Sequence, residues 1–239
     1  MYIRRAPQTL RKATKDMTGQ AELQWRESVP VSTRFDDPYY SLENGLAETR
    51  HVFLAGNDLS ARLKDGFQVA ELGFGTGLNL LACLQAWRAA GVSGVLRYTT
   101  FEAFPMAAED MIRAQAGFPE VAEIAEALAA HWQRGARAFD LPDLRFEMIE
   151  GDARETLPDW QGRADAWFLD GFSPAKNPEL WEEGLMAQVG AHTAPNGTAA
   201  TYTAAGFVRR GLEAAGFTVT RVPGYGRKRH MTQARMGSA

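Results

Sequence analysis

The chain has 239 residues, 45% of them hydrophobic and 23% charged, which is typical of a soluble globular protein with one α/β domain or two small ones. Apolar runs fall short of the roughly 20 residues that span a bilayer, and a single cysteine with four scattered histidines excludes an intrachain disulfide and argues against a metal site, which fits a cytoplasmic protein. The net charge is −3, but residues 1–15 carry +5 and residues 206–235 carry +6, a distribution typical either of a polyanion partner or of solubilising tails.

The first part of the chain is predicted to be an extension ahead of the main domain. Residues 1–40 form this extension, and it contains a short hairpin because the segments 21–27 and 29–35 alternate in polarity. A helix follows over about residues 46–55, where Gly56 and Asn57 end it. Residues 41–239 are then predicted to form one domain.

From Phe67 onward, strand patterns alternate with helix patterns. Strands are predicted over residues 67–73, 96–104, 144–152, 164–172, 197–203, 217–223 and 229–236. Helices are predicted over residues 77–90, 105–117 (with proline in the first turn), 119–134, 177–193 and 204–216. This alternation predicts an α/β fold: a doubly wound, Rossmann-like, mostly parallel sheet with its ligand at the carboxyl ends of the strands. The last two strands are joined too tightly for a crossover and are expected to be antiparallel neighbours.

The first of these strands ends in ELGFGTGLN, which contains Glu71, Gly73, Gly75, Gly77 and Asn79. Glycines at alternate positions let the backbone turn tightly and lie against a ligand, with the N-terminus of the next helix pointing at it. A dinucleotide motif would need glycine at position 78, where the chain has leucine. The spacing is the form seen in S-adenosylmethionine-dependent methyltransferases, and Glu71 would meet the cationic amino acid end of that cofactor. The alternative is a glycine-rich turn without a ligand.

Acidic residues also end the next two strands. Glu102 lies 25 residues after Gly77, where a carboxylate can accept hydrogen bonds from both ribose hydroxyls, unless it is a solvated strand-end residue. Asp152 follows Gly151 and is placed to accept a hydrogen bond from the adenine amino group. It can also cap the helix that begins at ARETL, and both roles are compatible.

The fourth strand runs into WFLDGFSPAKNPELW, residues 167–181, and brings Asp170 to the rim of the predicted cofactor site. Phe172 offers a face on which a planar base can stack. Lys176 is expected to meet a phosphate or a local acid, and two prolines stiffen the loop. A purely structural alternative is that Asp170 only forms an Asp-Gly turn.

These residues together resemble one family. ELGFGTGLNLL, FEAFP, WFLDGFSPAKNPELW, AGFVRRGLEAAGF and GYGRKRHM are similar to the methyltransferase that completes the 5-methylaminomethyl group on the wobble uridine of certain bacterial tRNAs. In some bacteria this enzyme is one half of a bifunctional protein that also carries a flavin-dependent oxidase. RFDDPYYSLENGLAETRHVFL looks similar too, so the resemblance covers about residues 29–232.

The resemblance implies a class I methyltransferase fold with S-adenosylmethionine as cofactor and tRNA, near its anticodon, as partner. Its motifs imply that Asp170 lies beside the transferred methyl group and the acceptor amine. The cofactor site would be formed by Glu71, Gly73, Gly75, Gly77, Asn79, Glu102 and Asp152. The chain ends soon after GRKRHM without a flavin motif, so we expect separate oxidase or upstream enzymes in the pathway. Residues 1–20 have no clear counterpart in the family.

The protonation of the acceptor amine predicts a role for Asp170. The acceptor must be a neutral amine, but an alkylamine has a pKa of about 10 and is protonated at neutral pH. Asp170 is therefore predicted to orient the amine and to accept its proton, directly or through water. The alternative is that Asp170 only orients the amine. The thiol of Cys83 is expected in the core, which disfavours methylation at a pyrimidine carbon through a catalytic thiol.

The loop between the last two strands is predicted to contact tRNA phosphates through Arg227, Lys228 and Arg229, with a solvated basic turn as the alternative. Three other functions compete with tRNA methylation. They are methylation of a small-molecule amine or hydroxyl, a nicotinamide-dependent oxidoreductase, and a non-catalytic module that retains the fold.

Overall fold

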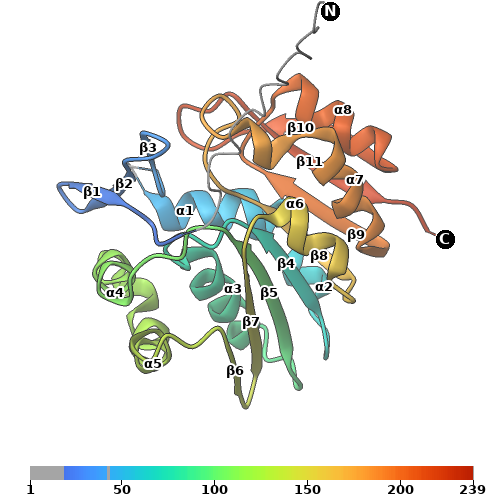
Figure 1. Cartoon of the computed structure of the whole chain (residues 1–239). Coiled ribbons are helices and arrows are strands. Elements are labelled where there is room, and N and C mark those ends of the chain that lie inside the picture. The colour runs from blue at the N-terminus through green and yellow to red at the C-terminus, as the bar shows by residue number, and fades with distance from the viewer. Residues whose placement is uncertain (1–18, 42–43, 239) are drawn as a thin grey trace, which may run out of the picture.

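A twisted eight-stranded sheet forms the centre of the molecule, with helices on both faces and a separate three-stranded sheet beside it (Figure 1). The structure is a computed structural model of the chain, and it describes residues 19–41 and 44–238. Residues 1–20, which have no clear counterpart in the family, lie almost wholly outside these ranges.

The central sheet has the strand order β10-β11-β9-β8-β4-β5-β7-β6. Its strands are β4 (Gln68–Leu72), β5 (Leu96–Glu102), β6 (Ala138–Leu141), β7 (Leu144–Glu150), β8 (Ala164–Leu169), β9 (Thr193–Thr201), β10 (Phe217–Pro223) and β11 (His230–Met236). The five strands from β9 to β7 are parallel, whereas β11 is antiparallel to both β9 and β10. The predicted mostly parallel α/β sheet with an antiparallel C-terminal pair is confirmed.

The α-helices fill the connections between strands. They are α1 (Gly45–Thr49), α2 (Leu59–Arg62), α3 (Leu78–Ala89), α4 (Ala108–Gln115), α5 (Ala122–Gln133), α6 (Ala153–Thr156), α7 (Glu183–Ala191) and α8 (Gly206–Ala214). A π-helical segment, Arg50–Ala55, continues α1, and single 3₁₀ turns occur at Pro119–Val121, Leu157–Asp159 and Pro178–Trp181.

Several elements differ from the sequence prediction, and strand β9, for example, begins at Thr193 rather than at Gly197. Helix α4 begins at Ala108 rather than in the turn of Pro105, because Ala107 has an extended backbone with ψ 142°. The single helix expected over residues 177–193 is divided at Glu182, which is also extended with ψ 156°. The edge strand β6 was not predicted; it pairs antiparallel with β7, and its four residues are too few for a recognisable pattern.

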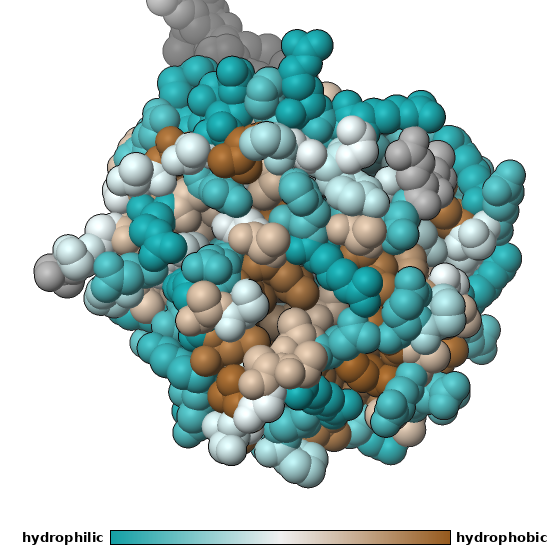
Figure 2. Space-filling model, turned by 180° about the vertical axis from the view of Figure 1, so that it is seen from behind, coloured by the Kyte–Doolittle hydropathy of each residue, from teal (hydrophilic) through white to brown (hydrophobic). Residues whose placement is uncertain are grey.

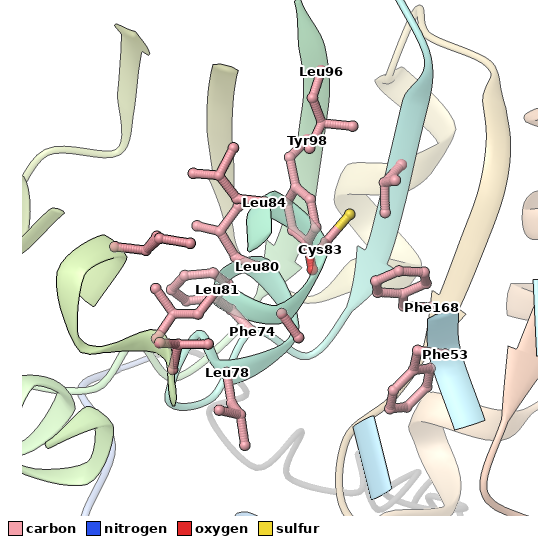
Figure 3. Packing of buried hydrophobic residues seen from close by; sticks show 14 of the residues in the cluster. Phe53, Phe74, Leu78, Leu80, Leu81, Cys83, Leu84, Leu96, Tyr98 and Phe168 are labelled. Atoms are coloured by element: carbon pink, nitrogen blue, oxygen red, sulfur yellow. The ribbon is translucent and has the colours of Figure 1, made fainter. Parts of the chain in front are cut away.

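Hydrophobic side chains fill both interfaces between sheet and helices. On one face, α3 and α5 pack over Tyr98, Phe146 and Phe168, and the thiol of Cys83 is fully buried there, as expected (Figure 3). On the other face, α6, α7 and α8 cover a second cluster around Trp167. Burying each of these large side chains contributes about 2 kcal/mol to stability, and the resulting rigid sheet fixes where its strands end.

The N-terminal sheet consists of β1 (Leu23–Arg26), β2 (Val29–Ser32) and β3 (Asp37–Pro38), and its β1–β2 pair is the predicted hairpin. It docks on α4, where the Trp25 indole donates a hydrogen bond to Asp110 at 3.2 Å and the Arg113 guanidinium lies 3.8 Å from the centroid of the same ring. This docking brings the segment 33–41 to the carboxyl edge of the central sheet.

The outer surface is largely polar. From behind, hydrophilic residues dominate the periphery and apolar residues gather around a hollow near the middle of the face (Figure 2). Among the residues that the structure describes, Phe207 is the large hydrophobic side chain that is exposed, at 45%. In the same part of the chain, no helix combines the length and apolar character that crossing a bilayer requires.

Candidate active site

A cleft of about 1080 Å³ lies at the carboxyl ends of the parallel strands, where ligands bind in sheets of this kind. The segment 32–41 and residues of α1 cover it from the other side. The predicted site residues that line it are Gly73, Gly75, Asn79, Glu102, Asp152, Asp170, Phe172 and Lys228. The predicted residues outside its lining are Glu71, Gly77, Lys176, Arg227 and Arg229.

The loop after β4 needs its glycines. Gly73 and Gly75 have φ values of +81° and +54°, a region that other residues rarely adopt. A Cβ at Gly73 would lie 3.0 Å from the Cα of Gly171, and a Cβ at Gly75 would lie 3.1 Å from the ring of Tyr39. The loop is therefore a bare backbone cradle at the start of α3.

Glu102 is held with its carboxylate facing this cradle. One oxygen accepts the backbone N–H of Gly75 at 3.0 Å and the other accepts that of Phe104 at 2.8 Å. Burial raises the pKa of Glu102, and these backbone donors act in the opposite direction. The backbone N–H groups of Phe74 and Ala103 also act on this carboxylate. A contact between Glu102 and the ribose of a cofactor stays a prediction.

Asp152 has a structural task that the sequence suggested as an alternative. Its side chain caps α6 by accepting the backbone N–H of Arg154 at 2.9 Å. The Arg154 guanidinium also donates to both carboxylate oxygens. With these donors, each oxygen has two partners, so the cap accounts for the carboxylate fully. Contact with an adenine amino group stays a prediction, and it would require Arg154 to move.

Asp170 follows β8 and lies half-buried in the cleft wall. Its Oδ1 accepts the N–H of Gly171 at 2.8 Å, and its Oδ2 accepts the amide of Asn79 at 2.7 Å. The same Asn79 amide donates to Glu71 at 2.9 Å, and its carbonyl oxygen accepts the hydroxyl of Thr49 at 2.8 Å. Two strands and two helices thus fix the direction in which Asp170 points.

Glu71 does not occupy the position predicted for it. Successive residues of β4 alternate between faces, and Glu71 turns under α3, where it is fully buried and outside the cleft lining. Desolvation raises its pKa well above the ordinary value, and the hydrogen bond from Asn79 acts in the opposite direction. A direct contact between Glu71 and the cationic end of a cofactor is therefore not available in this structure; Glu71 holds Asn79 instead.

The loop that follows Asp170 is packed against the N-terminal segment. Phe172 stacks on Phe35 with ring centroids 4.6 Å apart, and Tyr39 meets its ring edge-on at 5.0 Å. One face of Phe172 is thus already covered, which leaves only the other for the predicted base. Further along, Lys176 pairs with Asp36 at 2.9 Å, so it meets a local acid rather than an open phosphate site.

The predicted basic loop divides into two kinds of residue. Arg227 and Arg229 are exposed and lie outside the cleft lining, whereas the Lys228 side chain lies over the cleft. Its ammonium group is 2.7 Å from Glu48 on α1 and 4.0 Å from the centroid of the Tyr202 ring. Lys228 therefore lines the cleft and is separate from the two exposed arginines that were predicted with it to contact tRNA phosphates.

Sequence reasoning missed several cleft residues. Glu48, Thr49 and Tyr202 were not singled out, because each lies in an ordinary helix or strand-end pattern, although Glu48 and Thr49 belong to the segment 34–54 that is similar to the family. Phe35 and Tyr39 fall within RFDDPYYSLENGLAETRHVFL, whose similarity to the family was the available signal. Within residues 19–41 and 44–238, no three His, Cys, Asp or Glu side chains come together as a metal site would require.

The surroundings of Asp170 predict a pH dependence. Burial raises its pKa to about 6, and the donors Asn79 and Gly171 oppose that rise. An acceptor of protons must be ionised, so we expect kcat/KM for methyl transfer to fall about tenfold per pH unit below about pH 6. Initial rates between pH 5 and 8 check this. A falling limb near pH 4, the range of an ordinary aspartate, would contradict it.

Comparisons with known proteins agree with this geometry. A family model described as S-adenosyl-L-methionine-dependent methyltransferase matches residues 119–237. The crystal structure of MNMC2 from Aquifex aeolicus superposes with a TM-score of 0.75 at 24% identity, covering 92% of this chain and 72% of that one. The fold and the family model show that the chain is a class I S-adenosyl-L-methionine-dependent methyltransferase.

Two curated relatives are more specific. Proteins of Caulobacter vibrioides and Pseudomonas aeruginosa, both named tRNA 5-methylaminomethyl-2-thiouridine biosynthesis bifunctional protein MnmC, are 46% and 47% identical over 226 and 223 residues. The aligned parts cover 91% and 88% of this chain but 38% and 34% of the relatives. The chain belongs to the MnmC family and corresponds to its methyltransferase half, spanning little more than a third of the length of these relatives.

Proposed function

We propose that this chain transfers a methyl group from S-adenosylmethionine to the exocyclic amine of 5-aminomethyl- or 5-aminomethyl-2-thiouridine at the wobble position of tRNA. The observation that carries the proposal is Asp170, a carboxylate with a pKa of about 6 that faces a methyltransferase cleft. The names of the MnmC relatives support the nucleoside and the tRNA. Residues 41–239 would form the catalytic domain and residues 1–40 an N-terminal extension, in a cytoplasmic protein.

The residues of the cleft fit the cofactor. Gly73 and Gly75 let the backbone lie against it, and the two oxygens of Glu102 accept from its ribose. The N-terminus of α3 favours its carboxylate. When bound, the cofactor supplies a methyl group that its sulfonium already activates. The protein then contributes mainly alignment, which can account for a large part of a rate enhancement.

Asp170 has the remaining task. The acceptor arrives mostly as an ammonium ion, which has no lone pair for the methyl group. Asp170 accepts a hydrogen bond from this group and takes the proton that must leave before transfer. The donors Asn79 and Gly171 keep its carboxylate pointed into the cleft while this happens.

The direct test is methyl transfer from labelled cofactor to tRNA isolated from cells that lack this protein, followed by nucleoside analysis. Label in 5-methylaminomethyl-2-thiouridine supports the proposal. Label on a small molecule of the extract, with none in tRNA, would replace it with the small-molecule alternative. Absence of any transfer would reject both.

The exposed arginines of the β10–β11 loop are expected to bind tRNA phosphates. Changing Arg227 and Arg229 to glutamate should weaken tRNA binding about tenfold or more at moderate salt and flatten its salt dependence, because fewer counterions are released. Filter binding at several salt concentrations measures this. The same changes at Arg97, which is exposed on β5, serve as the control. Equal salt slopes for all variants would show that the loop does not contact the RNA.

A further inference from the structure

The side chain of Lys228 occupies a place in the cleft that its sequence position does not suggest. It comes from a loop whose arginines, Arg227 and Arg229, do not line the cleft, yet its ammonium nitrogen is 2.7 Å from a carboxylate oxygen of Glu48. The same nitrogen lies 4.0 Å from the centroid of the Tyr202 ring. Glu48 is largely buried, with 13% of its side chain exposed, whereas 45% of the Lys228 side chain is exposed. The Glu48 carboxylate and the Tyr202 ring thus hold the ammonium group of Lys228, whose long side chain has many rotatable bonds.

This place adjoins the reacting end of the cleft. The Tyr202 hydroxyl donates to the carbonyl oxygen of Gly171 at 2.8 Å, directly after Asp170. The charges of Glu48 and Lys228 both act on the Asp170 carboxyl. The ammonium of Lys228 is therefore a near neighbour of the group that is to receive the acceptor's proton.

A carboxylate beside an aromatic face is a general way in which proteins bind ammonium ions. The acceptor amine of the proposed reaction is itself an alkylammonium ion in water. Two ammonium ions cannot share this place without strong repulsion. The other carboxyl and guanidinium groups that line the cleft are those of Glu22, Arg34, Asp37, Glu102, Asp152 and Glu179. Of these, Asp37 already accepts the N–H of Ser173, and Glu102 and Asp152 are held by their own donors.

We propose that Glu48, Tyr202 and Asp170 form a subsite for the alkylammonium group of the acceptor, and that Lys228 fills this subsite until the acceptor displaces it. This inference rests on the proposed function and specifies its substrate class. The Lys228 side chain is 45% exposed, so it can leave the subsite for solvent without a change in the core. Once the acceptor is seated, one N–H bond breaks and its proton moves to Asp170, while the nitrogen keeps the electron pair. That pair forms the new bond to the methyl carbon as the bond from this carbon to the sulfonium sulfur breaks, and the sulfur keeps the electrons of that bond and leaves as a neutral thioether.

If Lys228 competes with the acceptor, its removal should strengthen the binding of tRNA. If Lys228 instead contacted a phosphate, its removal would weaken that binding. Lys228→Met removes the internal competitor, so the KM for tRNA should fall about threefold to fivefold with kcat little changed, a size set by breaking a partly exposed ion pair. Arg229→Met, in the same loop but outside the cleft, should raise the KM. Glu48→Gln should raise it too, because the subsite loses its carboxylate. A higher or unchanged KM in Lys228→Met overturns the proposal.

A second measurement separates this inference from the tRNA assignment. Binding of methylammonium ion to the full chain, followed by broadening of its NMR signal at constant ionic strength, needs no RNA. We expect Lys228→Met to bind methylammonium more strongly than the wild type does. The double variant that also carries Glu48→Gln should bind it more weakly than Lys228→Met does. Equal binding by all three proteins rejects the subsite, even if tRNA is methylated. The expected order together with no tRNA methylation rejects only the proposed function.

Discussion

Replacing Asp170 with asparagine is expected to reduce kcat for methyl transfer by about 100-fold or more, the contribution of a positioned proton acceptor. Asparagine keeps the size of the side chain and can still accept the N–H of Gly171, but it cannot take a proton. Affinity for S-adenosylmethionine should stay within about threefold, because the cradle and Glu102 are untouched. Single-turnover transfer to tRNA and calorimetric cofactor binding measure the two quantities. Wild-type turnover in this variant would remove Asp170 from the mechanism.

The same variant has a second signature in stability. Asp170 has a folded pKa of about 6, above its ordinary value of 3.8, so the folded protein holds the proton more tightly than the unfolded chain. The ionised carboxylate therefore costs stability above about pH 6, and this cost is absent below about pH 4. Relative to the Asp170→Asn variant, the wild type should lose on the order of 1–2 kcal/mol between these limits. A pH-independent difference between the two unfolding curves would contradict the raised pKa.

Replacing Glu102 with alanine is expected to weaken S-adenosylmethionine binding about 100-fold, because two hydrogen bonds to a charged acceptor are lost. The loss also frees the N–H groups of Gly75 and Phe104, so the glycine cradle loses its anchor. Isothermal titration with the cofactor measures the change, and because chemistry is not affected, kcat at saturating cofactor should change far less than the dissociation constant.

Glu150 provides the matched control for Glu102. It ends the neighbouring strand β7 in register with Glu102, but it is exposed, lies outside the cleft lining and pairs with Arg137. Glu150→Ala should leave cofactor affinity unchanged, since an exposed ion pair contributes about 0–1 kcal/mol to stability and nothing to the cleft. Equal loss of affinity in both variants would mean that the cleft responds to general destabilisation rather than to a missing ribose contact.

The sheet could be predicted because its information is local. Apolar strand runs such as AWFL and helix runs after each glycine specify βαβ units, and parallel strands must bring Gly73, Glu102 and Asp170 to one edge. The face to which a side chain turns is harder to predict. Glu71 and Gly73 are two residues apart in one motif, yet one is buried under α3 and the other lines the cleft.

The partners of each polar group could not be predicted either. Asp152 is held by Arg154, Lys176 by Asp36 and Lys228 by Glu48. Two of these pairs join residues 140 and 180 positions apart, so no window of sequence contains both members. Their geometry follows from the docking of the N-terminal sheet and of α1, which depends on tertiary packing.

The contact between the loop after Asp170 and the segment before α1 ties together parts of the chain that are 136 to 140 residues apart. Asp37 accepts the N–H of Ser173, and Phe35 stacks on Phe172, so both segments determine the shape of the loop after Asp170. A substitution in one segment therefore disturbs its contacts with the other. A change of acceptor among relatives should therefore appear as paired substitutions in these two stretches, and a transplanted loop should work only when its N-terminal counterpart travels with it.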